Sequence, residues 1–196
     1  MKFRIGSLFK RSGSVRSNSD HYRNPSLEHR IINNEHSWAL DLDRQDLNDR
    51  DMKIVVKYAM MKNHCKRIRL RDNHITSQGS SILSDGLHNN TRLELFDLRN
   101  NQISDIGAQV LSSAIVCSNI KTLNLESNEI TAEGAYYLAE MVKNSRTLAE
   151  LYLSKNHLGD RGVELLANAL IPDTEEESFN GEVNECIRIE NSNSFL

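Results

Sequence analysis

Two pairs of residues in this sequence have the types and spacing that catalysis uses. Asp41 and Asp43 are separated by one residue, so on a β-strand both carboxylates point to the same face. Two carboxylates on one face could serve as a general acid and a general base. His64 directly precedes Cys65, and an imidazole beside a thiol is one way to activate a cysteine nucleophile. Whether either pair can act depends on the elements that position it.

Those elements follow a repeat of about 28 residues. Each copy contains an alternating pair of apolar residues whose second member is leucine: Leu42, Leu70, Leu98, Leu125 and Leu153. These leucines are 28, 28, 27 and 28 residues apart. After each pair, the apolar residues change from alternation to the i, i+3, i+4 spacing of a helix. Repetition at this period predicts a solenoid of stacked strand–helix units.

An asparagine stands at the corner between strand and helix in most repeats. The residues in this slot are Asn73, Asn101, Asn128 and Asn156, and Gln45 holds it in the first repeat. A chain that turns inside the core leaves backbone N–H and C=O groups that must be paired. A side-chain amide carries both donors and acceptors, so we expect the four asparagines to form a ladder between successive repeats.

The predicted helices begin at residues suited to a helix N-terminus. The expected N-caps are Asn48, Thr76, Ser104, Thr131 and Gly159, with acidic residues in the first turn of most helices. Three residues after the last four caps stand Gly79, Gly107, Gly134 and Gly162. A glycine there would let the helix start pack closely on its neighbour. Asp51 takes this slot in the first repeat, which we interpret as a feature of the end copy.

The pattern LxxLxLxxNxLxxxGxxxLxxxL over residues 37–171 resembles the ribonuclease-inhibitor type of leucine-rich repeat. The same type occurs in NOD-like receptors and in Ran GTPase-activating protein. The resemblance implies an α/β fold, a leucine-rich repeat solenoid of about five repeats that forms a curved horseshoe segment. Parallel strands would line its concave face, and helices would cover its convex face. No GxxxxGK[ST] loop precedes the repeats, so the ATPase of a NOD-like receptor is not expected here.

The register of the repeat argues against both candidate catalytic pairs. Cys65 falls in an inward leucine slot, so we expect a buried small hydrophobic residue. Asp41 and Asp43 would lie beside Arg69 and Arg71 of the next repeat, which would pair with them. We therefore expect no catalytic residue, no metal site and no cofactor.

The outward strand positions form two rows of side chains on the predicted concave face. One row is Asp41, Arg69, Asp97, Asn124 and Tyr152, and the other is Asp43, Arg71, Arg99, Glu126 and Ser154. Parallel strands lie about 4.8 Å apart, and the charges along each row largely alternate. This face is either a self-neutralising polar surface or an arginine-rich surface that binds a protein. The candidate partner-binding residues are Arg67, Arg69, Arg71, Asp97, Arg99, Glu126 and Tyr152.

Different compositions flank the repeats. Residues 1–22 form a basic, serine-rich tail that is expected to be disordered. The tail could remain a solvated segment, contact an anionic membrane, act as a mitochondrial transit peptide or be phosphorylated at Ser14 and Ser19. An acidic loop and a possible C-terminal capping strand are expected in residues 172–196.

An N-terminal cap in residues 23–37 is expected to cover the first repeat of the solenoid, which spans residues 38–171. A repeat buries its core only against its neighbours, so the open end needs a cover. The residues expected to close it are Ile31, Ile32 and Trp38. We interpret Trp38 as a capping residue, although a binding aromatic is the alternative.

Composition limits the function. The 196 residues carry a net charge of −3, which gives no global reason to bind nucleic acid or an anionic membrane. No apolar run approaches the ~18 residues needed for stable membrane insertion, and three cysteines without a CxxC motif indicate a cytoplasmic protein. We predict a non-enzymatic, monomeric adaptor or regulator that binds another protein. The alternative is a GTPase-activating regulator resembling Ran GTPase-activating protein, which a stimulated GTPase rate would distinguish.

Overall fold

The computed structural model describes residues 22–34, 37–63, 65–88, 90–171 and 188–190. Its elements alternate between strand and helix, as the repeat predicts. In chain order they are α1 (Pro25–Asn33), β1 (Ala39–Asp41), α2 (Asp49–Val55), the π-helix η2 (Val56–Met60), β2 (Arg67–Arg69), α3 (Ser77–Leu87), β3 (Leu95–Asp97), α4 (Ser104–Ile115), β4 (Thr122–Asn124), α5 (Ala132–Asn144), β5 (Glu150–Tyr152), α6 (Gly159–Ala169) and β6 (Arg188–Glu190). Most of the predicted tail and acidic loop, at residues 1–21 and 172–187, lies outside the described residues.

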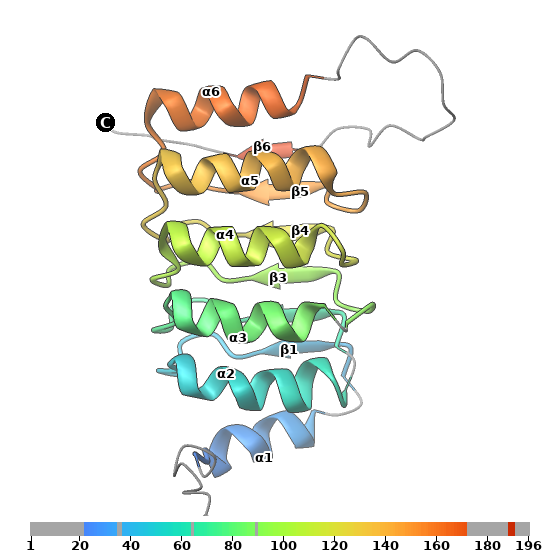
Figure 1. The fold of residues 1–196 in the computed structure, drawn as a ribbon. Helices are drawn as coiled ribbons and strands as arrows, with labels where there is room; N and C mark the ends of the chain where they lie inside the picture. The colour runs from blue at the N-terminus through green and yellow to red at the C-terminus, as the bar shows by residue number, and fades with distance from the viewer. Residues whose placement is uncertain (1–21, 35–36, 64, 89, 172–187, 191–196) are drawn as a thin grey trace, which may run out of the picture.

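The strands form one parallel sheet in the order β1-β2-β3-β4-β5-β6. Figure 1 shows the strands stacked in one layer, with α2 to α6 stacked in a second layer in front of it. Each strand pairs with the strand of the next repeat, so that Leu40 lies opposite Ile68 and Leu123 opposite Leu151. The predicted leucine-rich repeat solenoid, with strands on the concave face and helices on the convex face, is confirmed.

The core runs between the two layers and contains the repeated leucines. Leu42, Leu70, Leu98, Leu125 and Leu153 are each 0% exposed. Complete burial of a leucine side chain contributes roughly 1.5–3 kcal/mol. Cys65 is 1% exposed in the inward slot, and its burial raises the pKa of the thiol. Cys65 is therefore a buried hydrophobic residue, as predicted, and its thiolate is disfavoured.

The corner asparagines connect successive repeats by hydrogen bonds. In Asn73, Nδ2 donates to the carbonyl oxygens of Leu42 and Leu70 at 3.0 and 2.8 Å. Its Oδ1 accepts from the backbone N–H groups of Gln45 and Leu47 at 3.1 and 3.0 Å. Similar bonds to backbone groups are made by Asn101, Asn128 and Asn156. Each amide thus satisfies backbone groups that the turn into the core would leave unpaired.

Three of the five predicted N-caps are confirmed, and two are wrong. The side chains of Asn48, Thr76 and Thr131 accept a hydrogen bond from the backbone N–H two residues later. Ser104 and Gly159 instead have φ values of 59°, and neither α4 nor α6 has a side-chain cap bond. An N-cap side chain reaches the first amides from an extended backbone, which a left-handed residue does not have.

Aspartate bridges connect the helix starts in alternate repeats. Asp49 Oδ1 accepts from the backbone N–H groups of Thr76 and Gly79 at 2.8 and 2.9 Å, and Oδ2 accepts from the Thr76 hydroxyl at 2.7 Å. The same bridge joins Asp105 to Thr131 and Gly134. A Cβ atom added to Gly79 would lie 2.4 Å from Asp49 Oδ1. The glycine is therefore required for the carboxylate to approach the helix start.

Asp51 takes the glycine slot of the first repeat because α1, not another repeat, covers this end. Its side chain is buried, and Oδ1 accepts hydrogen bonds from the Tyr22 hydroxyl at 2.9 Å and from Asn24 Nδ2 at 2.8 Å. Oδ2 accepts from the Asn48 backbone N–H at 3.0 Å. Asp51 thus ties the residues before α1 to the start of α2.

Two of the three residues expected to close this end are not buried. Ile31 is 0% exposed, but Ile32 is 41% exposed and Trp38 is 57% exposed. The interpretation of Trp38 as a capping residue is therefore wrong, since Leu27 and Ile31 of α1 are the side chains buried at this end. Within the described ranges, no helix combines the length and apolarity that crossing a bilayer requires.

Candidate protein-binding face

The candidate site is the solvent-facing side of the parallel sheet, which we call the strand face. It consists of the outward residues of β1 to β5 and of the corner after each strand. In β2, Arg67 and Arg69 are exposed while Ile68 between them is buried. The strand register places Arg69 between Asp41 and Asp97, as the sequence predicts. Side chains from different repeats therefore meet on this face.

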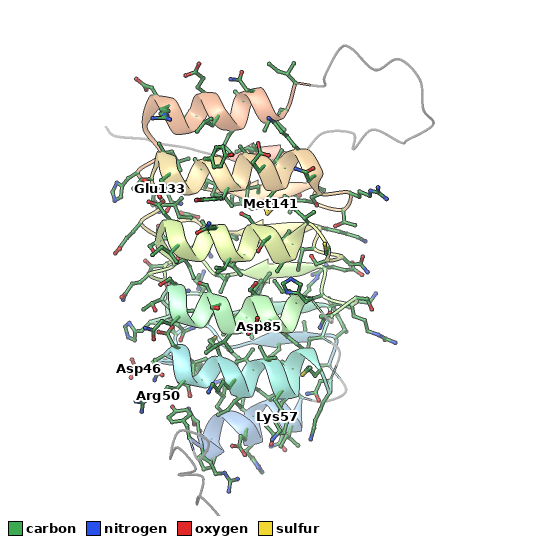
Figure 2. All side chains as sticks on the ribbon, in the orientation of Figure 1. Asp46, Arg50, Lys57, Asp85, Glu133 and Met141 are labelled. Carbon is green, nitrogen blue, oxygen red and sulfur yellow. The ribbon has the colours of Figure 1, made fainter. Side chains whose placement is uncertain are left out.

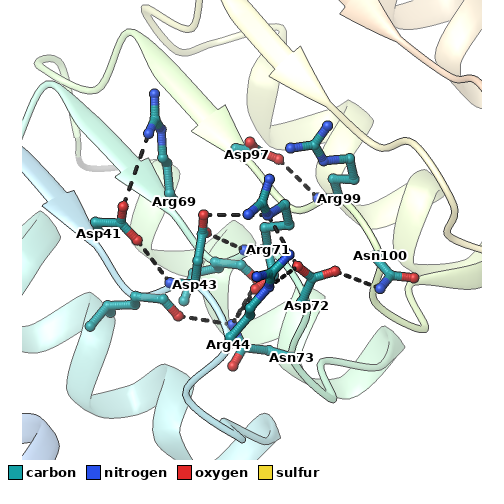
Figure 3. Close-up of polar contacts among 12 residues, drawn as sticks. Asp41, Asp43, Arg44, Arg69, Arg71, Asp72, Asn73, Asp97, Arg99 and Asn100 are labelled. Carbon is teal, nitrogen blue, oxygen red and sulfur yellow. Dashed lines mark hydrogen bonds and ion pairs between the residues drawn. The ribbon is translucent and has the colours of Figure 1, made fainter.

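Arg71 lies in a cluster of paired charges at the corner after β2 (Figure 3). Its Nε atom lies 3.4 Å from Asp43 Oδ2 and 3.1 Å from Asp72 Oδ2. Asp43 Oδ1 also accepts from the Arg71 backbone N–H at 2.8 Å. Hydrogen bonds from Asn100 and then from Arg44 lower the pKa of Asp72. The Arg71 guanidinium is 29% exposed and is held by these partners.

Arg99 is paired in the same way, one repeat further along the chain. Its Nη1 atom lies 3.6 Å from Glu126 Oε2, and Lys155 Nζ lies 3.1 Å from Glu126 Oε1. Asp97 accepts a hydrogen bond from the Arg99 backbone N–H at 3.0 Å. Desolvation nevertheless raises the pKa of the Asp97 carboxyl. The middle of the strand face is therefore an ordered network of charges.

Arg67 and Arg69 are less restrained than Arg71 and Arg99. The nearest ion-pair approach of Arg69 is 4.0 Å to Asp41, and both side chains are more than half exposed. Exposed pairs of this kind contribute roughly 0–1 kcal/mol. Arg67 makes no ion pair with any carboxylate in the described part of the chain. These two guanidiniums keep most of their capacity to bind another molecule.

Trp38 lies next to Arg67 of the strand face, whereas the sequence predicts a place for it in the N-terminal cap. The Arg67 guanidinium carbon lies 4.7 Å from the centre of the indole ring, a cation–π distance. The repeat register could have found this contact. Trp38 precedes β1, in the slot that holds Lys66 and Lys121 in later repeats, and this slot is exposed.

The C-terminal part of the strand face has a different composition. Tyr152 is half-buried and its hydroxyl donates to Glu150 Oε2 at 3.4 Å. Thr122 donates to the same oxygen at 3.0 Å. Most candidate residues therefore lie together, with Arg67 to Arg99 on β2, β3 and the corners that follow them and Glu126 paired with Arg99 from the corner after β4. Tyr152 lies one strand further, on β5.

The carboxylate pair that suggested acid–base chemistry is used in structural contacts. Asp41 Oδ1 accepts from the Asp43 backbone N–H at 3.0 Å, and the two side chains approach Arg69 and Arg71. This pairing was predicted from the register. His64 lies outside the described residues. In the described ranges, histidine, cysteine, aspartate and glutamate side chains form no group of three or more that could hold a metal ion.

Comparisons with known proteins agree with the repeat. Residues 89–112, 116–139 and 144–167 match the family model described as Leucine Rich repeat. The chain is 31% identical to human NACHT, LRR and PYD domains-containing protein 14 over 71% of its own length and 13% of that protein. It is 34% identical to mouse ribonuclease inhibitor over 51% of its length and 23% of that protein. It thus spans less than a quarter of either relative.

A solved structure described as the actin-binding site 2 of leiomodin-1 is also similar. The likeness covers 74% of this chain and 70% of that one, with 20% identity and a TM-score of 0.49.

Proposed function

Because the chain is built of leucine-rich repeats of the ribonuclease-inhibitor type, we propose that it is a non-catalytic module that binds another protein through its strand face. The observation that carries this proposal is the pair of exposed, weakly engaged guanidiniums, Arg67 and Arg69, beside the exposed Trp38 indole. Arginine and tryptophan are the residue types most often found at binding hot spots.

The neighbouring network supports this use of the strand face. Arg71 and Arg99 are held by Asp43, Asp72 and Glu126, so they present a surface that is ordered before binding. A preordered surface loses less side-chain entropy on association. Arg67 then supplies charge that no described carboxylate neutralises, and Arg69 supplies charge that its 4.0 Å approach to Asp41 neutralises only in part. The partner should therefore carry acidic side chains where it meets β2.

We further propose that the protein is an adaptor or regulator and that it acts in the cytosol as a monomer. The cysteines support a cytosolic location, because Cys65 and Cys117 are both free among the described residues and Cys117 is exposed. The measurement for the oligomeric state is sedimentation equilibrium of the full chain. A stable dimer at micromolar concentration would contradict the monomer.

A comparative affinity purification tests the proposed face. Arg67→Glu combined with Arg69→Glu reverses both weakly engaged charges, and Arg146→Glu combined with Arg161→Glu makes an equal change at exposed positions of the C-terminal repeat units. We expect a partner to be retained by the wild type and by the Arg146/Arg161 variant. With the purified partner, the Arg67/Arg69 variant should bind at least about tenfold more weakly, or ~1.4 kcal/mol. Equal binding by the two variants would refute the proposal.

A further inference from the structure

A pocket away from the strand face is lined by residues of α1, α2 and η2 and by the residues just before α1. We call it the cation pocket. It is an open pocket of about 350 Å³, and its walls include Arg23, Arg50, Lys53, Lys57 and the rings of Tyr22 and Tyr58. Arg50 and Lys57 are labelled on α2 and at the start of η2 in Figure 2. The site shares no residue with the strand face, so it does not depend on the proposed function.

The charge of the cation pocket is not neutralised by its surroundings. Glu28 also lines the pocket, but it is bonded to Arg23, with Arg23 Nη2 at 3.2 Å from Glu28 Oε2. Arg50, Lys53 and Lys57 make no ion pair with any described carboxylate. The whole chain, in contrast, has a net charge of −3. Three cations that no described carboxylate neutralises therefore lie together on an acidic protein.

The helical spacing explains how these cations converge. Arg50, Lys53 and Lys57 are three and four residues apart, so they follow one edge of α2 into η2. The π-helical turn closes with the Met61 backbone N–H bonded to the Val56 carbonyl at 3.0 Å. π-turns are rare and occur often at functional sites. Like charges at this spacing repel, which is a cost that a bound anion would remove.

The two tyrosines give the pocket fixed walls. The Tyr22 hydroxyl donates to the buried Asp51 at 2.9 Å, and the Arg50 guanidinium lies 5.9 Å from the Tyr22 ring centre. Lys57 and Lys62 lie 5.0 and 4.8 Å from the Tyr58 ring centre. Cations that contact an aromatic face are partly oriented by it. The pocket is thus formed before any ligand arrives.

We propose that the cation pocket binds a ligand with several phosphate groups. Each phosphomonoester carries nearly two negative charges at neutral pH and offers three acceptor oxygens, which suit the donors of lysine and arginine. A pocket of this size fits a compact, multiply charged group such as a phosphorylated inositol ring. Four cationic side chains around an open pocket do not suit an uncharged metabolite.

The ligand could be a lipid headgroup or a soluble polyphosphate, and the sequence before the pocket favours the lipid. Five cations (Lys2, Arg4, Lys10, Arg11 and Arg16) and five large apolar residues (Met1, Phe3, Ile5, Leu8 and Phe9) lie in the residues that precede Tyr22. The first acidic residue of the chain is Asp20. Basic and apolar residues together favour contact with an anionic membrane.

Titration of the full chain with inositol hexakisphosphate tests the pocket itself. Calorimetry should show saturable binding by the wild type. Lys53→Glu combined with Lys57→Glu should weaken it at least about tenfold, since two cations beside the bound phosphates are replaced by two anions. Lys53→Gln combined with Lys57→Gln should weaken it less. Arg146→Glu combined with Arg161→Glu is the control with the same total charge and should leave binding unchanged. Urea unfolding confirms that each variant is folded.

Flotation with phosphatidylcholine vesicles, with and without phosphatidylinositol bisphosphate, identifies the source of the phosphates. Recruitment only by the phosphorylated vesicles, lost in the Lys53/Lys57 variants, would support the pocket with a lipid ligand. Binding of inositol hexakisphosphate without recruitment to the vesicles would support a pocket whose ligand is a soluble polyphosphate. The proposal would be overturned if the wild type showed no saturable binding to the soluble probe. It would equally be overturned if the Arg146/Arg161 control weakened binding as much as the Lys53/Lys57 variant.

Discussion

Buried and exposed residues alternate along each strand, and the two sides of the sheet differ in how strictly their residue types repeat. On the buried side, leucine recurs at Leu70, Leu98 and Leu125, and each corner carries an amide. On the strand face, the slot of Arg71 becomes Arg99, then Glu126. Each buried residue packs on its counterpart in the next repeat, so one shape must suit both neighbours. The strand face meets solvent, which imposes no such match and leaves it available for recognition.

The largest expected effect is on the buried side. Leu125→Ala should lower the free energy of unfolding by about 2–5 kcal/mol, because it leaves a cavity inside the fourth repeat, between two others. Urea denaturation measures this loss. The control is the neighbouring strand-face residue, with Asn124→Ala expected to cost less than about 1 kcal/mol. Equal costs at the two positions would contradict the difference between the two sides.

The corner amides should come next in size. Asn128→Ala should cost about 1–3 kcal/mol, since it leaves the buried Ile103 N–H without its side-chain acceptor. It also removes one of the two amide donors to the Leu98 carbonyl, which keeps only Asn101. Asn100→Gly is the matched control, because Asn100 lies at an exposed corner position and bonds to the half-buried side chain of Asp72, and glycine tolerates its left-handed φ of 54°. We expect its cost to stay near 0–1 kcal/mol. A wild-type urea midpoint for Asn128→Ala would show that the asparagine ladder does not stabilise the fold.

The aspartate bridge should have an intermediate effect. Asp105→Ala removes hydrogen bonds to the Thr131 N–H, the Thr131 hydroxyl and the Gly134 N–H, at an expected cost of about 1–2 kcal/mol. Asp160 holds the equivalent place after Gly159 but makes no hydrogen bond to another described residue. Asp160→Ala should therefore change the thermal midpoint little. A larger loss at Asp160 than at Asp105 would contradict the bridge.

The strand-face arginines should affect binding far more than folding. Arg67→Glu combined with Arg69→Glu should change the free energy of unfolding by less than about 1 kcal/mol, because both side chains are exposed and weakly paired. Circular dichroism during thermal unfolding measures this change. A loss of several kcal/mol in the free energy of unfolding would mean that Arg67 and Arg69 stabilise the fold. Weaker binding by the variant would then reflect unfolding and not a lost contact with the partner.

The smallest expected effect depends on pH. Desolvation raises the pKa of Asp97 above the unfolded value of about 3.9, so folding favours its protonated form. The stability that this proton adds is fully present below the unfolded pKa and is lost as pH rises through the folded pKa. Asp97→Asn should therefore be slightly stabilising at pH 7, by less than about 1 kcal/mol, and should lose this gain near pH 3. Urea unfolding at pH 7 and pH 3 measures the change in stability. A gain found only at pH 3 would contradict the expected direction of the Asp97 pKa shift.

Much of the fold follows from the repeat alone. The spacing of Leu42 to Leu153 predicts strands, corners and helices in the right order, and it predicts which strand residues become neighbours. The pairing of Asp43 with Arg71 follows from that register. Local rules were less successful at the helix starts, where Ser104 and Gly159 have left-handed φ values. The cap preference of a residue type does not reveal which backbone conformation the previous corner requires.

The site was predicted less completely than the fold. The register identified the outward residues and the pairing of Arg71 with Asp43. It did not show that Arg99 is also held in an ion pair, or that Arg67 and Arg69 remain exposed. Side-chain reach decides this, and reach depends on rotamers that spacing does not determine. Trp38 was assigned to the core because aromatic residues near an open end usually cover it. The contact between α1 and α2 had already been filled by Leu27 and Ile31.

The sequence by itself determined the period of this protein, and with it the stacking of strands, the buried leucines and the amide ladder. Those features depend on contacts between residues one repeat apart, and the period of the sequence identifies these residues directly. Only the tertiary structure decided where α1 rests, and therefore how Tyr22 and Arg23 come to lie beside Arg50, Lys53 and Lys57. The cation pocket joins two segments that belong to no common repeat. Their proximity results from packing around Asp51, a contact that no periodicity in the chain encodes.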